Sequence, residues 1–359
     1  MDRLGPFQII RRLGSGGSAE VFLARGPTPS GEAELALKLI LPHLADDGGH
    51  RAMLLREARM VMPLRHPNIV EIYDVGEVDG RTWLAMEYLS GWPFHTFLKG
   101  LRDQSLTLSL SEAAHLVREA ALGLHHAHEA TDEHGQPLGI VHRDVSPHNL
   151  MVSRDGHVKV VDFGLARATH TAATQTGGLK GKLRYMPPEQ LRSEPLDRRA
   201  DVFALGAILW DLALGQPLHP GPTEADIFQQ ALFLPQPHPD EVAPGLPRAF
   251  VDVLQRAVAR EADRRFASAL ALADALVPFI HPDAAAAVAR LGECLQPSPA
   301  PERRPTREEV IDWDAPPAEP PRVAPSRSQL PHVRRATRPS GSAPPVLPHP
   351  QAHDSRPRT

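Results

Sequence analysis

The sequence is short of lysine and of cysteine. Of its 39 basic side chains only five are lysines, namely Lys38, Lys99, Lys159, Lys180 and Lys182, so arginine carries the generic surface charge. Each lysine is therefore a candidate for a specific role. The single cysteine, Cys294, excludes an internal disulfide bond and fits a reducing compartment.

Long apolar runs and a strong excess of charge are missing as well. No run of about 18 apolar residues is present, and glycines and charges occupy the first thirty residues, which predicts neither a membrane span nor a signal peptide. The net charge of -4 and the pI near 6.5 give no case for nucleic acid as a partner. With 42% hydrophobic residues the chain can bury a core, and we expect a cytoplasmic protein.

The pattern of apolar residues changes twice along the chain. Alternation around a glycine cluster predicts strands between residues 7 and 40, then a helix over 48–64, then short strands over 69–78 and 82–89. Helical patterns follow over 111–130, where we expect a serine cap, and over 201–215 and 248–260. Residues 297–359 hold 16 of the 38 prolines and ten arginines without a periodic apolar pattern, which predicts a disordered tail.

Two motifs in the strand-rich part suggest contacts with phosphate. In "LGSGGSAEVF", residues 13–22, Gly14 and Gly16 allow a turn whose backbone N–H groups approach a phosphate, and Ala19 stands where a third glycine would stand. A purely structural hairpin is the alternative. In "LALKLI", Lys38 lies on a strand between apolar neighbours and is either a solvent-reaching edge residue or a phosphate contact that needs a carboxylate partner such as Glu57.

The segment "IVHRDVSPHNLMV" adds a second group of polar residues. Asp144 can accept a proton from a hydroxyl nucleophile, and Asn149 offers an amide oxygen to a hard cation. Thirteen residues later, Asp162 in "VVDFGLA" supplies a second acid at the end of a short strand, which follows an Asp-Gly turn at residues 155 and 156. Two acids, an amide and a lysine are the groups that phosphoryl transfer needs, because that reaction depends on positioning and on neutralisation of charge.

In this order the motifs resemble those of the eukaryotic-type (Hanks-type) serine/threonine protein kinases of bacteria. The motifs, from residue 14 to residue 266, are "GSGGSA", "LALK", "REA", "RHPNIV", "HRDVSPHN", "DFG", "MPPEQ", "DVFALG" and "RRF". The resemblance implies an α+β bilobal fold, with a small N-terminal antiparallel β lobe that carries one key helix and a larger, mainly α-helical C-terminal lobe. It implies a kinase domain over 7–280 (N-lobe about 7–86, hinge 87–92, C-lobe 93–280), a short helical extension over 281–296 and the tail over 297–359.

The resemblance also implies the roles of the residues that match its motifs. Lys38 then holds the α- and β-phosphates of ATP and pairs with Glu57. Asp144 is the catalytic base, and Asn149 and Asp162 bind Mg²⁺, with Mn²⁺ as an alternative ion. Met86 is similar to the gatekeeper residue, and the backbone from Glu87 to Leu89 is similar to the hinge that binds adenine. The residues placed at the nucleotide are Leu13, Gly14, Ser15, Gly16, Gly17, Val21, Ala36, Lys38, Met86, Glu87, Leu89 and Asn149.

Structural and regulatory residues follow from the same resemblance. Glu189 and Arg265 match a buried ion pair that fastens the activation segment, and Asp201 matches the residue that braces the catalytic loop. Arg143, directly before the catalytic aspartate, is typical of kinases that a phosphate in the activation segment switches on. Thr174 and Thr176 are the preferred phosphorylation sites over Thr169 and Thr171, and an ordinary polar loop is the alternative.

Four positions depart from the family pattern. Ala19 and Pro187 are mild changes, whereas Ser146 replaces the lysine of the catalytic loop and Lys182 replaces a threonine of the activation segment. In the family both of the latter positions lie against the catalytic aspartate. We therefore hypothesise that Lys182 and Ser146 have exchanged the lysine and hydroxyl roles beside Asp144.

The predicted function is an ATP-dependent serine/threonine protein kinase that phosphorylates protein hydroxyls and its own activation segment. The alternative from another class is a pseudokinase, a nucleotide-binding scaffold without turnover. A small-molecule phosphotransferase is disfavoured by "MPPEQ" with Arg265, and tyrosine specificity is disfavoured by the bacterial type of glycine loop. The tail is a candidate docking segment for a partner or simply a solvated terminus, and the resemblance permits a homodimer.

Overall fold

A computed structural model describes residues 3–15, 19–41, 48–78, 80–163 and 179–295 of the chain, and among these it describes no side chain for 48–54 or for 179–180. All of them belong to one compact unit, residues 1–310. Gly16, Gly17, Thr174, Thr176 and the predicted tail over 297–359 lie outside the described residues.

The described strands form two antiparallel sheets. The first has six strands in the order β1-β2-β3-β4-β6-β5, and the second has three in the order β7-β8-β9. The strands are β1 (Arg3–Leu4), β2 (Phe7–Ser15), β3 (Ala19–Thr28), β4 (Gly31–Ile40), β5 (Ile72–Val78), β6 (Arg81–Glu87), β7 (Gly91–Pro93), β8 (Leu150–Ser153) and β9 (Val158–Val160).

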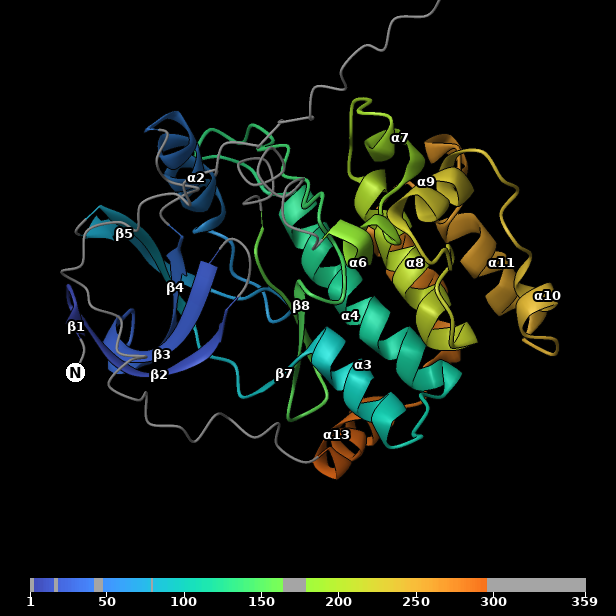
Figure 1. Cartoon of the computed structure of the whole chain (residues 1–359), viewed down its shortest axis with the longest axis horizontal. Coiled ribbons are helices and arrows are strands. Elements are labelled where there is room, and N and C mark those ends of the chain that lie inside the picture. Colours follow the sequence, from blue (N-terminus) through green and yellow to red (C-terminus); the bar gives the residue numbers. More distant parts are fainter. Residues whose placement is uncertain (1–2, 16–18, 42–47, 79, 164–178, 296–359) are drawn as a thin grey trace, which may run out of the picture. The chain divides into compact units, whose positions relative to one another are not determined.

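One helix accompanies the larger sheet, and the other described helices belong to the part of the chain that follows β7 (Figure 1). The helices are α2 (Gly48–Val61), α3 (Phe94–Asp103), α4 (Leu110–His128), α6 (Leu179–Leu183), α7 (Pro188–Leu191), α8 (Arg199–Leu214), α9 (Glu224–Leu232), α10 (Pro239–Val242), α11 (Arg248–Ala257), η1 (Ala262–Arg264), α12 (Ala269–Leu276), η2 (Val277–Phe279) and α13 (Ala284–Cys294). A strand-rich part with one helix, followed by a larger helical part, confirms the predicted α+β bilobal fold.

The register of the larger sheet places several of the predicted nucleotide residues on one face. Val21 of β3 pairs with Gly14 on one side and with Lys38 of β4 on the other. Two residues before Lys38, Ala36 pairs with Met86 of β6. Because paired residues and alternate residues along a strand share a face, Val21, Ala36, Lys38 and Met86 project from the same side of the sheet.

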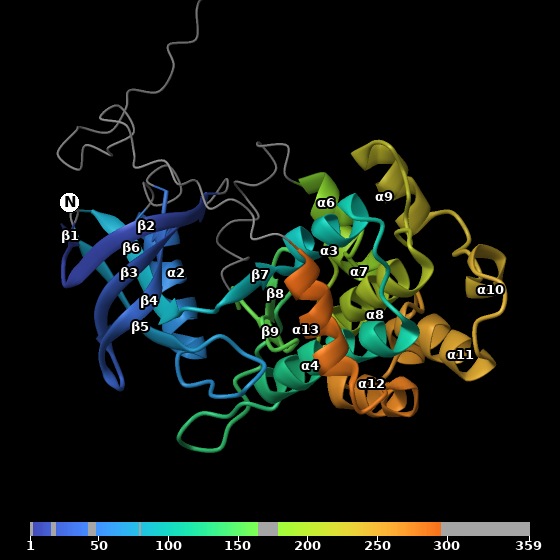
Figure 2. The same ribbon diagram turned by 90° about the horizontal axis from the view of Figure 1, so that it is seen from below.

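Two long helices form the centre of the helical part. In α8, every residue from Ala200 to Trp210 is buried, as expected for a helix that is almost entirely apolar. The helix is capped at its C-terminus by Gly215, which has a left-handed φ of 73°. Helix α4 packs against α8, α12 and α13, and Figure 2 shows α13 beside it. The residue that caps α4 is Ser109, two residues before the start that the pattern predicted, and it forms a capping box with Glu112.

Within the described ranges, no single helix is both long enough and apolar enough to cross a membrane. The segments Ala269–Phe279 and Ala284–Cys294 meet such a criterion only as a pair, and they are bent by 86° relative to one another.

Candidate active site

Lys38 forms an ion pair with Asp162. Its Nζ lies 2.7 Å from Asp162 Oδ1, and the residue itself is 8% exposed. We had predicted Glu57 as its partner, and Glu57 lies half-buried in α2; the Lys38–Asp162 pair is a contact that the sequence did not predict. Burial would raise the pKa of Asp162, but the nearby Lys38 ammonium outweighs that effect and holds the pKa below its usual value. Asp162 is therefore ionised at neutral pH.

The backbone at Asp162 has an unusual conformation. Asp162 follows β9 and has a φ of 62°, a left-handed value that costs about 1–3 kcal/mol for a residue with a side chain. The next residue, Phe163, is buried, and its ring lies 4.8 Å from that of His142. His142 Nε2 also donates to Val161 O at 2.9 Å. The contacts of His142 on both sides therefore hold the segment in this conformation.

Asp144 lies between a lysine and an amide. Its Oδ2 accepts a hydrogen bond from Asn149 Nδ2 at 2.8 Å and lies 2.5 Å from Lys182 Nζ. Asn149 Nδ2 also donates to Asp144 O at 2.7 Å, so the amide oxygen of Asn149 faces away from this loop. The three side chains come from two separate segments, because Lys182 belongs to α6.

The surroundings of Ser146 agree with only half of the exchange that we hypothesised. Lys182 contacts Asp144, as a relocated lysine would. Ser146, however, is 1% exposed, and within the described structure its Oγ has no hydrogen-bond partner. Ser146 therefore does not take over the hydroxyl role beside Asp144 in this conformation.

Asp201 holds the backbone that precedes Asp144. Its two carboxylate oxygens accept hydrogen bonds from the N–H of His142 at 2.8 Å and the N–H of Arg143 at 2.9 Å. His128 Nε2 donates to the same carboxylate at 2.7 Å. Burial would raise the pKa of Asp201, but the hydrogen bond from His128 and the other donors keep it below its usual value. Arg143 has a left-handed φ of 65°, and these bonds keep it there.

The segment after Lys182 is attached to the helical part by a buried ion pair. Arg265 donates to Glu189 through two nitrogens, at 2.6 and 2.8 Å, and its side chain is fully buried. The neighbouring Gln190 donates through Nε2 to Arg143 O at 2.8 Å. Gln190 thus links this segment to the loop of Asp144, a role that the sequence did not indicate.

The residues predicted to bind adenine lie where β6 leads into β7. The Glu87 N–H donates to Glu71 O at 2.9 Å, so this N–H is not available to a ligand. The Glu87 side chain forms an ion pair with Lys159 of β9 at 2.8 Å, a contact that the sequence did not predict. Met86 lines a small apolar cavity that extends to Asp162 and Phe163. Leu89 is half-buried in the segment between the two strands.

The described part of the glycine-rich turn contains Leu13, Gly14 and Ser15 at the end of β2. A Cβ atom added to Gly14 would meet no atom of the described residues within 4 Å. Contacts with the described residues therefore do not explain a glycine at this position. It fits a backbone that leaves room for a ligand.

The donor groups of this site suit a nucleotide and a hard cation. Asp162 and Asn149 supply a carboxylate oxygen and an amide oxygen, the ligand types that Mg²⁺ and Mn²⁺ accept. Lys38 supplies an ammonium group next to Asp162, where a phosphate carried by such an ion would lie.

Comparison with known proteins agrees with this geometry. A family profile described as "Protein kinase domain" matches residues 7–277. The chain is 40% identical over 278 residues to the tyrosine-protein kinase MasK of Myxococcus xanthus, a match that covers 77% of this chain and 43% of that protein. It is 34% identical over 272 residues to the serine/threonine-protein kinase PknH of Mycobacterium tuberculosis, covering 75% and 41%. The chain thus spans less than half the length of these relatives.

Among solved structures, the kinase domain of Mycobacterium tuberculosis PknI is similar, with a TM-score of 0.59 and 28% sequence identity over 77% of this chain and 97% of that one. The family profile covers most of the chain, and the lysine, the two aspartates and the asparagine of its motifs lie together in space. The chain belongs to the protein kinase family, in the eukaryotic-type (Hanks-type) branch that occurs in bacteria.

Proposed function

We propose that the chain is an active, ATP-dependent protein kinase that transfers the γ-phosphoryl group to serine and threonine hydroxyls of proteins. The cluster of Asp144, Asn149 and Lys182 beside the Lys38–Asp162 pair carries this proposal. It unites a proton acceptor, two groups for a cation and two positive charges, which is the complete set that phosphoryl transfer needs. The relatives PknH and PknJ, named as serine/threonine-protein kinases, support the specificity.

The contacts of Asp144 indicate which of its oxygens accepts the proton. Oδ2 is held by Lys182 and by Asn149, while no donor among the described residues is bonded to Oδ1. We assign Oδ1 as the atom that accepts the proton of the substrate hydroxyl. The positive charge of Lys182 offsets the negative charge of Asp144 and so reduces its repulsion of the phosphoryl group that is transferred. Lys182 therefore takes the place of the lysine that this catalytic loop lacks at Ser146.

Lys38, Asn149 and Asp162 bind the nucleotide and its cation in this proposal. Mg²⁺, when bound, neutralises the charge that develops on the phosphate oxygens. Asp162 is ionised and Lys38 already lies beside it, so the two groups need little rearrangement to hold the phosphates and the ion. Asn149 presents its amide oxygen because its nitrogen is occupied by Asp144.

Incubation of the full chain with labelled ATP, Mg²⁺ and a mixed protein substrate tests this function, with Asp144→Asn as the matched control. Asp144→Asn keeps the shape of the side chain but removes the proton acceptor, so transfer is expected to fall by at least about 100-fold. If both proteins incorporated the same amount of label, the chain would have no transfer activity that depends on Asp144, and the pseudokinase alternative, a scaffold that binds nucleotide, would be favoured.

Tyrosine specificity is the second candidate, because the relative MasK is named a tyrosine-protein kinase. Analysis of the phosphorylated amino acids in the same reaction separates the two candidates. We expect phosphoserine and phosphothreonine, and phosphotyrosine alone would overturn the specificity that we propose. Mapping of the sites on the chain itself tests autophosphorylation at Thr174 and Thr176.

A further inference from the structure

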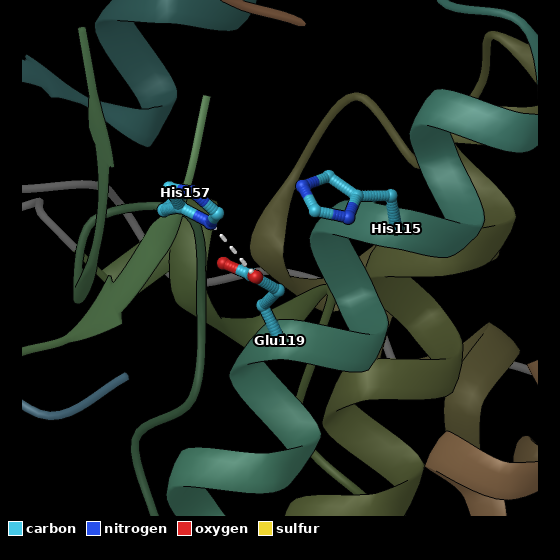
Figure 3. Close-up of side chains that lie close together, drawn as sticks. All are labelled: His115, Glu119 and His157. Atoms are coloured by element: carbon cyan, nitrogen blue, oxygen red, sulfur yellow. Dashed lines mark hydrogen bonds and ion pairs between the residues drawn. The ribbon is translucent and has the colours of Figure 1, made fainter. Parts of the chain in front are cut away.

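A second cluster of ligand-type side chains lies away from the candidate active site, between α4 and the turn that joins β8 to β9. His115 and Glu119 are one helical turn apart on α4, so they share a face, and His157 projects from the turn (Figure 3). One ligand atom from each of the three residues lies within 4.8 Å of the other two. Two imidazoles and one carboxylate therefore converge from two separate elements.

The carboxylate of this cluster is held in a fixed orientation. Glu119 Oε2 accepts hydrogen bonds from Val158 N at 2.8 Å and from Asn68 Nδ2 at 3.1 Å. Asn68 is itself buried and donates to Val158 O at 2.9 Å. The other oxygen, Oε1, faces His157 Nδ1 at 2.9 Å. Glu119 thus has one oxygen fixed by outer contacts and the other directed into the cluster, an arrangement typical of a metal ligand with its supporting shell.

Each of the two imidazoles can offer a lone pair to this space when its ring carries a single proton. His115 Nε2 donates to Gly156 O at 3.0 Å, and His157 Nδ1 donates to Glu119 Oε1. A neutral imidazole carries one proton, which can move to the ring's other nitrogen. Each ring can therefore give up its present hydrogen bond and offer an unprotonated nitrogen to a cation while its proton stays on the ring.

We propose that His115, Glu119 and His157 form a binding site for a divalent transition-metal ion of the Zn²⁺ class. Imidazole nitrogens with one carboxylate suit Zn²⁺, Co²⁺ and Ni²⁺, whereas Mg²⁺ and Ca²⁺ prefer oxygen ligands alone. Three protein ligands leave a fourth position for water. The oxygen-only pair Asn149 and Asp162 selects a different class of ion, so the two sites are distinguishable by their chemistry.

Closure of the site needs only a small movement. Ligand atoms around tetrahedral zinc lie about 3.3 Å apart, closer than the 4.8 Å that bounds the cluster. The side chain of His157 is 55% exposed and belongs to a turn, so it is the residue that moves, while that of Glu119 is 13% exposed and held by its partners. The ion ties the β8–β9 turn to α4. Asn149 directly precedes β8 and Asp162 follows β9, so the ion steadies the hairpin that carries both.

The site is tested on the full chain, free of affinity tags and stripped of metal, by titration with Co²⁺ in excess Mg²⁺. Co²⁺ bound by nitrogen and oxygen ligands in a tetrahedral site absorbs visible light. Zn²⁺ does not absorb visible light, so its displacement of Co²⁺ is seen as a loss of the absorption. We expect one equivalent of Co²⁺ to bind and one equivalent of Zn²⁺ to abolish the absorption. A titration without tetrahedral absorption would overturn the proposal.

The variant His157→Gln sharpens the test, because glutamine can still donate to Glu119 but is a poor metal ligand. His134→Gln is the matched control, since His134 is also exposed, with a side chain 77% accessible, and also lies beside a glutamate, Glu133. We expect an affinity loss of about 100-fold for His157→Gln and none for His134→Gln. Equal affinities in the two variants would refute the site. The measurement involves no phosphoryl transfer, so its failure leaves the proposed function untouched.

Discussion

Replacement of Lys182 by alanine is the most direct perturbation of the proposed mechanism. Two unit charges about 4 Å apart interact by about 4 kcal/mol at the effective dielectric constant of 20 that applies near a protein surface. The side chain of Lys182 is 35% exposed, so solvent screens part of this interaction and leaves about 3 kcal/mol acting on the phosphoryl group beside Asp144. That energy corresponds to a fall of about 100-fold in the rate of transfer.

The assay compares kcat and the affinity for ATP in the wild type and in Lys182→Ala. Lys182 contacts Asp144, whereas Lys38 lies in a different ion pair, so we expect kcat to fall by about 100-fold and the dissociation constant of ATP to change by less than about threefold. Lys99→Ala is the matched control, because Lys99 forms only an exposed ion pair with Asp103. A kcat within about threefold of the wild type would refute the role of Lys182. A variant that loses affinity for ATP but keeps the wild-type kcat would refute that role as well.

Three further predictions concern stability, each measured as the free energy of unfolding in urea. Burial, with Arg260 and Arg184 nearby, lowers the pKa of His219 to about 4, whereas the unfolded chain takes up a proton near 6.5. The free energy of unfolding of the wild type should therefore fall by up to about 3 kcal/mol as the pH falls from 6.5 to 4, and His219→Leu should remove that fall. Parallel plots of unfolding free energy against pH for the two proteins would contradict this. Glu189→Gln should destabilise by about 3–5 kcal/mol because it leaves the Arg265 charge buried without a counterion, and a change below about 1 kcal/mol would count against the ion pair. Gly156 and Gly135 both have a left-handed φ, but of the two only Gly156 is close to another backbone atom: a Cβ there would lie 2.0 Å from an oxygen in α13. Gly156→Ala should therefore lower the free energy of unfolding by at least about 2 kcal/mol more than Gly135→Ala does.

The order of the motifs was enough to predict the fold and the family, because each motif has a local physical requirement. Alternation marks the strands, apolar periodicity marks the helices, and the acid and amide in "HRDVSPHN" stand at a spacing that a single loop can bring together. Asp144 and Asn149 are five residues apart, and the structure joins them by a hydrogen bond.

The scarcity of lysine in the sequence was a useful guide to the site. Of the four lysines with described side chains, three pair with acids of the candidate active site, namely Lys38, Lys159 and Lys182, while Lys99 forms a surface pair. Composition alone singled these residues out, but it did not identify their partners. We had not predicted the Lys38–Asp162 pair or the Lys159–Glu87 pair.

Partner choice was decided by tertiary structure, since it depends on distances between segments far apart in the chain. Asp144 and Lys182 are 38 positions apart in the sequence, and only the family resemblance, not the spacing, suggested that the two side chains meet. The unpaired Oγ of Ser146 depends on packing around a buried position. The same holds for His115, Glu119 and His157, where only the folding of a hairpin turn onto α4 brings the third residue to the other two. Local spacing thus determined the chemical groups that this protein possesses, while long-range packing decided which of them act together.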